Sequence, residues 1–209
     1  MSEKAAKKLR LGVLLSGGGR TLVNLLQAPN LPAEVAVVIA SRPCGGVQKA
    51  EDAGLDVHLV PYRDFGPDRL EEYSRRITGR LDAAGVDLVI LAGFLSMWII
   101  PPHYAGRVMN IHPALLPNFG GRGMFGRHVH EAVLAAKCKE SGCTVHFVTN
   151  DYDDGPVILQ KTVPVYDTDG PDDLAARVFE QECLAYPEAI RLFAEGRLTV
   201  DGKIVRIAN

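Results

Sequence analysis

With 209 residues the chain can fill one sizeable hydrophobic core or at most two small ones, and its 23 basic against 25 acidic residues exclude the large positive field that attracts nucleic acid. Its four cysteines lack the C-x-x-C spacing of a zinc or redox site, and its apolar stretches are too short for a signal-peptide core or a bilayer span. We therefore expect a cytoplasmic protein with free thiols, a monomer or homodimer that binds neither nucleic acid nor a membrane.

The first half of the chain alternates short apolar runs with segments of helical periodicity. Each apolar run has the length of a buried strand, and strands that alternate with helices at this spacing predict a doubly wound, mostly parallel α/β sheet. The predicted strands are residues 9–15, 35–40, 57–60 and 87–91, and the predicted helices are the segment containing Leu22, Leu25 and Leu26, then 47–53 and 67–84.

A glycine-rich turn, residues 16–21, joins the first predicted strand to the first predicted helix. Glycines let the chain approach an anion closely, and a helix that begins there aims its free N–H groups and its dipole at the same point. The turn matches neither the dinucleotide pattern G-x-G-x-x-G nor the P-loop. Two interpretations stay open: a phosphate site, or only a tight connection.

Residues 108–111 form an apolar run that predicts a further buried strand, which ends before Pro113. Asn110 and His112 are two positions apart, so they point to the same side at the carboxyl end of that strand. Ligands of open α/β sheets bind at that end, and an amide with an imidazole there can hold a developing oxyanion. The alternative is that Asn110 satisfies a loop backbone and His112 is an ordinary, partly buried histidine.

The second half has less regular spacing. Residues 117–127 are rich in glycine and predict an irregular loop of the kind that covers sites. An acidic turn spans residues 150–156, and the sequence Asp201-Gly202 predicts a small C-terminal hairpin. The predicted strands are 144–149, with alternating burial, and 157–165; the predicted helices are 130–136 and 171–194, the latter with Leu174, Val178, Leu184, Ile190 and Leu192 on its apolar side. Without repeats or an obvious linker, one domain with two halves fits best.

Five segments in order resemble one family: LGVLLSGGGRTL, DLVILAGFLSMW, HYAGRVMNIHPALLP, GCTVHFVTNDYDDGPVILQ and the helix with Gln181-Glu182. The chain resembles the glycinamide ribonucleotide formyltransferases, folate-dependent transferases of purine biosynthesis and one-carbon metabolism. The resemblance implies a Rossmann-like fold, a phosphate-binding half (9–106) and a catalytic and folate-binding half (107–209). It also implies formyl transfer from 10-formyltetrahydrofolate to the amine of glycinamide ribonucleotide, without a metal or a covalent enzyme intermediate.

Three catalytic residues follow from the resemblance: Asn110, His112 and Asp153. Asn110 and a protonated His112 suit the oxyanion of a tetrahedral intermediate, and an ionised Asp153 would raise the pKa of His112 and orient its ring. Asp151 and Asp154 compete as turn residues that cap local N–H groups, and the D-x-G-P pattern selects Asp153 over them.

The resemblance assigns the substrate phosphate to Gly19, Arg20 and Thr21, and the glycinamide part to Glu182. Arg20 and Thr21 depart from the commoner S/T-N of the family, and Phe179 stands where a polar residue is frequent. Arg20 would add charge for a phosphate. Alternatively, Glu182 is an exposed helix residue paired with Arg177 or Lys161.

Folate contacts are expected at Leu95, Ser96, Met97, Asn150 and Asp151, where two loops and apolar side chains can hold a flat pterin. Trp98 is predicted as a core residue, and Leu95 and Met97 have the same alternative. Two further expectations are a surface position for His130 and a flap over the site formed by residues 119–126.

Other functions remain as alternatives. Methionyl-tRNA formyltransferases and formyltetrahydrofolate hydrolases carry additional domains, while sugar-nucleotide formyltransferases change only the amine that accepts the formyl group. An NAD-dependent oxidoreductase is disfavoured, because the glycine turn lacks the last glycine of the fingerprint and Ser41 and Arg42 stand where an acid is expected. A non-catalytic binding module would not need Asn110, His112 and Asp153 to converge.

Overall fold

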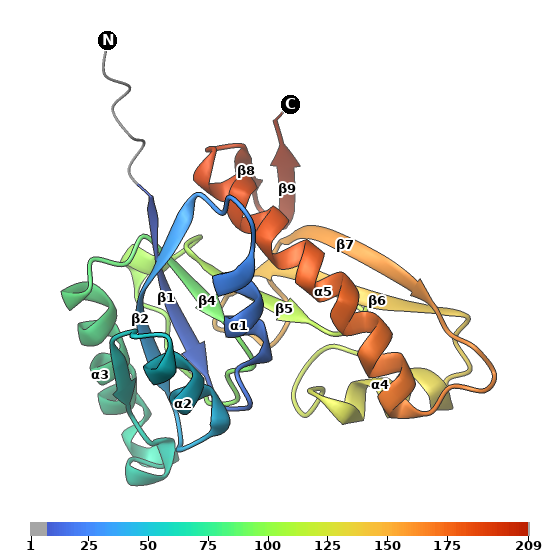
Figure 1. Ribbon diagram of the computed structural model, residues 1–209, viewed down its shortest axis with the longest axis horizontal. Coiled ribbons are helices and arrows are strands. Elements are labelled where there is room, and N and C mark those ends of the chain that lie inside the picture. The colour runs from blue at the N-terminus through green and yellow to red at the C-terminus, as the bar shows by residue number, and fades with distance from the viewer. Residues whose placement is uncertain (1–7, 209) are drawn as a thin grey trace.

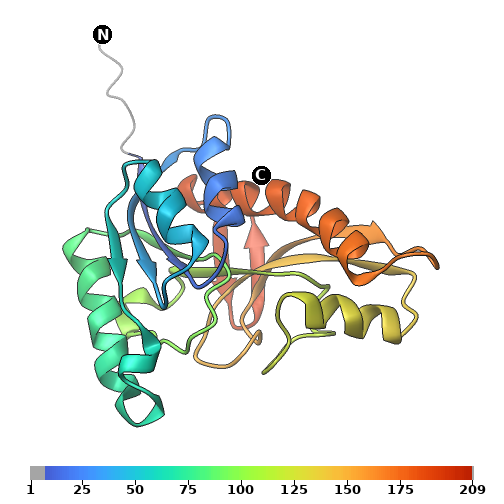
Figure 2. The ribbon, with the colours of Figure 1, turned by 60° about the horizontal axis from the view of Figure 1, so that its bottom comes forward.

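The computed structural model describes residues 8–208. This part of the chain forms a single nine-stranded sheet with the strand order β3-β2-β1-β4-β5-β6-β7-β9-β8, flanked by helices (Figures 1 and 2). The strands are β1 (Leu9–Leu15), β2 (Ala33–Ala40), β3 (Val57–Leu59), β4 (Leu88–Leu91), β5 (Val108–His112), β6 (Glu140–Phe147), β7 (Val157–Pro164), β8 (Leu198–Asp201) and β9 (Ile204–Ile207). The helices are α1 (Arg20–Gln27), α2 (Gly45–Asp52), α3 (Leu70–Ala83), α4 (Arg127–Ala135) and α5 (Pro171–Ala194), with 3-10 turns at Tyr62–Asp64, Pro67–Arg69 and Pro102–Tyr104.

Strands β1 to β5 are parallel, as the alternation of strands and helices predicted. Successive side chains of a strand point to opposite faces, so each buried strand supplies two cores. On one face, Leu11 and Val13 of β1 pack in a core with residues of α1, α2 and α5. On the other face, Leu14 packs with Tyr73 and Ile77 of α3. The predicted doubly wound, mostly parallel fold with a C-terminal hairpin is confirmed.

From β5 onward the sheet changes direction, since β6 runs antiparallel to both β5 and β7. The prediction for this strand was wrong in two respects. It runs from Glu140 to Phe147 rather than over 144–149, and every residue after Glu140 is buried instead of alternating. The cause is tertiary: β6 has a strand on each side, and α5 covers one of its faces.

The prediction that Leu184 faces the core was wrong, and two further details could not be inferred from the sequence pattern. Leu184 of α5 is 59% exposed and Leu26 of α1 is 40% exposed, although both fit the helical spacing of apolar residues. The tight turn of the hairpin consists of Gly202 and Lys203, because Asp201 still pairs with Ile204. Gly202 has the left-handed φ of 61° that this turn requires.

All four cysteines are free thiols. Burial raises the pKa of the Cys143 thiol to about 12, so this thiol stays protonated at neutral pH and is a poor nucleophile. Among the helices of residues 8–208, none combines the length and the apolar character of a transmembrane span. The division of the chain into halves at residue 107 stays a prediction.

Candidate active site

The register between β5 and β6 assembles the centre of the site. Asn110 lies directly opposite His146, and His112 lies opposite Thr144, so alternate residues of two antiparallel strands share one face. Asn110 and His112 line a cavity of about 360 Å³ together with Thr21, Asp153 and Glu182. The cavity lies at the carboxyl end of β5, as predicted.

Asp153 reaches this cavity from the turn that follows β6. Its Oδ2 atom lies 3.6 Å from Nδ1 of His112 and accepts a hydrogen bond of 2.9 Å from the Gly121 N–H. Asp151 instead lies in a local turn in which its N–H donates to the Thr149 hydroxyl, and Asp154 forms an ion pair with Lys203 at 2.7 Å. The structure therefore brings Asn110, His112 and Asp153 together and leaves the two competing carboxylates outside.

The acidic turn depends on a close backbone approach at Gly155. A Cβ atom at this position would lie 1.7 Å from the carbonyl oxygen of Phe147. Asp153 itself adopts a left-handed φ of 50°, which aspartate tolerates better than most residues. The glycine of the D-x-G-P pattern thus lets the turn fold back onto β6 and present Asp153 to the histidines.

His146 is a site residue that the sequence analysis missed. Its ring is almost fully buried, and its Nδ1–H donates to the Phe147 carbonyl at 2.8 Å. Its Nε2 atom accepts from the Asn110 amide at 3.2 Å and lies 3.7 Å from Oδ1 of Asp153. The sequence did contain a relevant pattern: Thr144 and His146 are two positions apart on a predicted strand, so their side chains lie on the same face. If that strand pairs with the strand of Asn110 and His112, all four side chains share this face. That signal becomes usable only when the antiparallel register is known.

The glycine-rich loop after β5 is tied to the same residues. Nε2 of His112 donates to the carbonyl of Phe119 at 2.8 Å, and the loop residues Gly121 and Phe125 line the catalytic cavity. Residues 117–126 are irregular, as predicted, and α4 begins directly after them. In this conformation the Nε2 proton of His112 is already held by the Phe119 carbonyl, so an oxyanion must compete with Phe119 for it.

The direction of the His112 pKa differs from our expectation. Burial lowers the pKa of the imidazole, and this effect outweighs the raising effects of Asp153 and of the Phe119 carbonyl. For Asp153, burial acts to raise the pKa, but the contacts with His146, the Gly121 N–H and His112 together hold it below its usual range. The resting pair therefore combines an ionised Asp153 with a neutral His112.

The glycine turn with the predicted phosphate-binding residues leads directly into α1. Gly19 has a φ of 73°, and a Cβ there would lie 2.7 Å from Cα of Gly46, so this position requires glycine. Thr21, in the first turn of α1, lines the catalytic cavity. Arg20 does not; it lines a neighbouring open groove of about 560 Å³, with its guanidinium 3.6 Å from the ring centre of Phe179.

Glu182 lies on α5 at the edge of the catalytic cavity, partly buried. Burial raises the pKa of its carboxyl to about 7, and the neighbouring Arg20 counteracts part of this rise. The alternative partners are engaged elsewhere: Arg177 pairs with Asp169 and Lys161 pairs with Glu188, both at 2.7 Å. Glu182 is therefore available to a ligand.

Most of the predicted folate residues surround one smaller cavity of about 110 Å³. Ser96, Met97, Asn150 and Asp151 line it, next to Asn110 and His146. Leu95 lies apart from this group, on the wall of the catalytic cavity.

Two other residues near the site were also assigned from the sequence. Trp98 is 5% exposed and its indole N–H donates to the Thr78 hydroxyl at 3.2 Å, as a core residue would, although part of it also lines the cavity of about 110 Å³. His130 is 5% exposed, so the prediction of a surface histidine was wrong. The helix α4 turns this residue inward, and burial lowers its pKa.

Comparison with known proteins identifies the family of this chain. The profile of the family described as formyl transferase matches residues 9–190. The chain belongs to the formyl transferase family. Phosphoribosylglycinamide formyltransferase of Escherichia coli K12 is 39% identical over 91% of this chain and 89% of its own length. The chloroplastic phosphoribosylglycinamide formyltransferase of Vigna unguiculata is 35% identical over 94% of this chain and 64% of its own length.

Solved structures agree with this assignment. Glycinamide ribonucleotide transformylase 1 from Symbiobacterium toebii superposes with a TM-score of 0.87 at 40% identity, covering 98% of this chain and 96% of that chain. The family resemblance inferred from the sequence is confirmed, and the chain is a formyltransferase. Within residues 8–208, no group of three or more histidine, cysteine or acidic side chains is arranged to hold a metal ion.

Proposed function

We propose that this chain transfers the formyl group of 10-formyltetrahydrofolate to the amine of glycinamide ribonucleotide in purine biosynthesis. The observation that carries the proposal is the convergence of Asn110, His112 and Asp153 on one cavity that also contains Thr21 and Glu182. The family membership and the similarity to phosphoribosylglycinamide formyltransferases over most of the chain support the choice of reaction.

In the first step the substrate amine attacks the formyl carbon, and a carbon–nitrogen bond forms. The former carbonyl oxygen becomes an oxyanion. One N–H of the Asn110 amide is held by His146, which leaves the other N–H free to donate to this oxyanion. The proton that the attacking amine loses passes through Asp153 to Nδ1 of His112, and the Nε2–H of His112, released from the Phe119 carbonyl, is the second donor. Donors of this kind typically contribute about 2.7–4 kcal/mol each.

Collapse of the intermediate breaks the bond between the formyl carbon and N10 of the folate. The attacking amine must lose a proton and N10 must gain one, so a group that accepts and returns a proton completes the balance. Asp153 is ionised and lies next to His112, so it serves this transfer, through water where the distance requires it. It also stabilises the imidazolium form of His112 while the oxyanion exists.

The amine substrate would bind in the phosphate-binding half of the chain, residues 9–106. Its phosphate would meet the backbone N–H groups of Gly19, Arg20 and Thr21 at the start of α1, a favourable place for an anion. Glu182 would accept hydrogen bonds from the glycinamide end. A carboxyl with a pKa of about 7 ionises readily when a cationic or hydrogen-bonding ligand arrives.

The folate would bind in the other half, where Ser96, Met97, Asn150 and Asp151 line the second cavity. Asn110 and His146 border this cavity as well as the catalytic centre, so a pterin held there would bring its formyl group toward Asn110. Leu95 would contact the junction of the two substrates from the wall of the catalytic cavity.

The test is an assay of the purified protein with 10-formyltetrahydrofolate and a panel of amines. We expect turnover with glycinamide ribonucleotide and release of tetrahydrofolate. Turnover of an amino-sugar nucleotide instead would show a formyltransferase with another acceptor. Release of formate without any acceptor would show a hydrolase, and either result would overturn the proposed substrate.

A further inference from the structure

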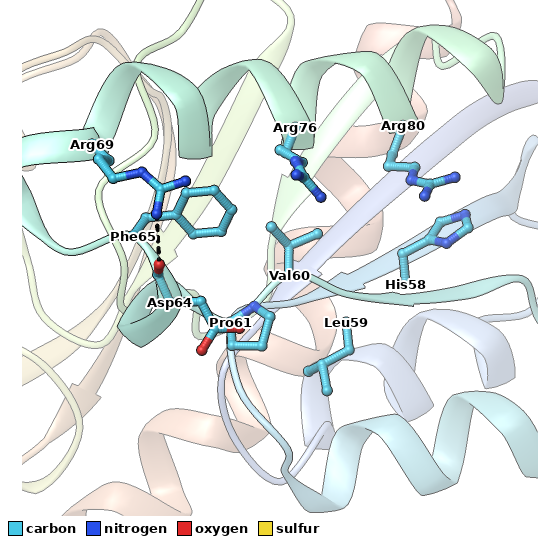
Figure 3. Close-up of a pocket in the computed structure, with 9 residues that line it drawn as sticks. All are labelled: His58, Leu59, Val60, Pro61, Asp64, Phe65, Arg69, Arg76 and Arg80. Carbon is cyan, nitrogen blue, oxygen red and sulfur yellow. Dashed lines mark hydrogen bonds between the residues drawn. The ribbon is translucent and has the colours of Figure 1, made fainter.

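A groove of about 380 Å³ lies between α3 and the edge strand β3 (Figure 3). One wall carries Arg69, Arg76 and Arg80. The other wall and the floor consist of His58, Leu59, Val60, Pro61, Asp64 and Phe65. No residue of this group also lines the catalytic or the folate cavity in the part of the chain that the structure describes. The groove is therefore separate from the proposed active site.

Two of the arginines are neighbours on the same face of α3. Arg76 and Arg80 are four residues apart, a spacing that puts side chains next to each other on a helix. In Figure 3 both side chains extend from α3 toward β3, with His58 below Arg80. Like charges at this spacing repel each other, so the arrangement is unfavourable unless an anion lies between them.

Acidic side chains pair closely with Arg69, weakly with Arg76 and not with Arg80 within residues 8–208. Glu72 binds Arg69 at 2.7 Å and reaches Arg76 only at 4.0 Å. The Arg80 side chain has no hydrogen bond or ion pair with any residue between 8 and 208. Positive charge is therefore in excess at the Arg76–Arg80 end of the groove.

Apolar side chains form a smaller part of the groove. Val60 points toward the arginines and Phe65 lies beside Arg69, whereas the exposed side chain of Leu59 points away from them (Figure 3). Guanidinium groups are weakly hydrated planar donors that bind the oxygens of phosphates and carboxylates in pairs. Two neighbouring guanidinium groups of this kind suit a small ligand with several charged oxygens.

We propose that this groove is a binding site for a small, multiply charged oxyanion, with its phosphate or carboxylate groups between Arg76 and Arg80 and its remaining atoms above Val60. A nucleic acid is a poorer fit, because the whole chain carries a net charge of −2. An extended acidic peptide is also a poorer fit, because β3 offers an edge of only three residues. The proposal does not depend on the formyl-transfer reaction.

The test is calorimetric titration of the protein at low ionic strength with pyrophosphate and, separately, with citrate. The test variant is Arg76→Gln/Arg80→Gln. The control variant is Arg75→Gln/Lys139→Gln, which removes the same charge from exposed side chains outside the groove that are paired with Glu71 and Asp167. Thermal unfolding of both variants checks that they are folded. The glycine turn is intact in both, so any anion that binds there affects them equally.

We expect the dissociation constant of one anion to rise about tenfold or more in the test variant and less than about twofold in the control. Preference for pyrophosphate would identify a phosphate ligand, and preference for citrate a carboxylate ligand. Equal weakening in both variants would mean that only overall charge matters and would overturn the proposal. Absence of saturable binding of either anion to the unaltered protein would overturn it as well.

Discussion

Glu182 makes the stability of this protein depend on pH in a direction opposite to that of most carboxylates. Burial raises the pKa of its carboxyl to about 7, against the ordinary value of 4.5. Between these two pH values the folded chain keeps a proton that the unfolded chain has released. Stability therefore falls as pH rises from 4.5 to 7, and the loss is complete above about pH 7.

The substitution Glu182→Gln removes this titration and keeps the shape of the side chain. At about 1.36 kcal/mol for each pH unit between the two pKa values, the variant should be about 3 kcal/mol more stable than the unaltered protein above pH 7, and nearly equal to it near pH 4.5. Urea unfolding at about pH 5 and about pH 8.5 measures both differences.

Glu180→Gln is the matched control, because Glu180 is exposed on the same helix. Its free energy of unfolding should differ little from that of the unaltered protein at either pH. A gain for Glu182→Gln that is the same at both pH values, or no gain at the higher pH, would refute the argument from burial. Both variants replace a glutamate by glutamine, so the difference between their free energies of unfolding reports only the effect of burying the carboxyl of Glu182.

Three further predictions concern the site and the turns around it. Asp153→Asn should lower kcat about 10²–10⁴-fold while both substrates still bind, and unchanged turnover would remove Asp153 from the mechanism. Arg20→Ser should raise KM for the amine substrate several-fold and leave KM for the formyl-folate unchanged; equal changes in both would show that Arg20 does not act on the phosphate. Gly155→Ala should destabilise the protein by about 1–3 kcal/mol or more, because its Cβ would overlap the Phe147 carbonyl. Gly79→Ala in α3, which has open space around it, should instead stabilise the protein by about 0.4–1 kcal/mol. Denaturant unfolding of both variants tests this contrast.

The fold could be predicted largely from local patterns. Buried parallel strands are continuous apolar runs, and their connecting helices show a different period, so β1 to β5 and their helices were found nearly at their true bounds. The error at β6 has the same origin. A strand buried on both faces need not alternate, so the four residues before Thr144 gave no signal.

The site was predicted in part. Asn110 and His112 follow from the strand that carries them, and Asp153 follows from the resemblance of its turn to that of the formyltransferases. His146 could not be found in this way, because its role depends on lying opposite Asn110 across 36 residues of chain. The buried position of His130 was missed for a similar reason, since the amino-acid pattern of α4 does not reveal what covers it.

The amino-acid sequence determined which segments become strands and helices, where the glycine turns lie and which family the chain resembles, because these depend on the chemistry of neighbouring residues. The tertiary structure decided which side chains meet and how each one titrates. Asp153 alone would raise the pKa of His112, yet burial lowers it. The burial of a side chain depends on all the residues that pack around it. Around His112 these residues come from distant parts of the chain, so the local sequence does not reveal how far its pKa is lowered.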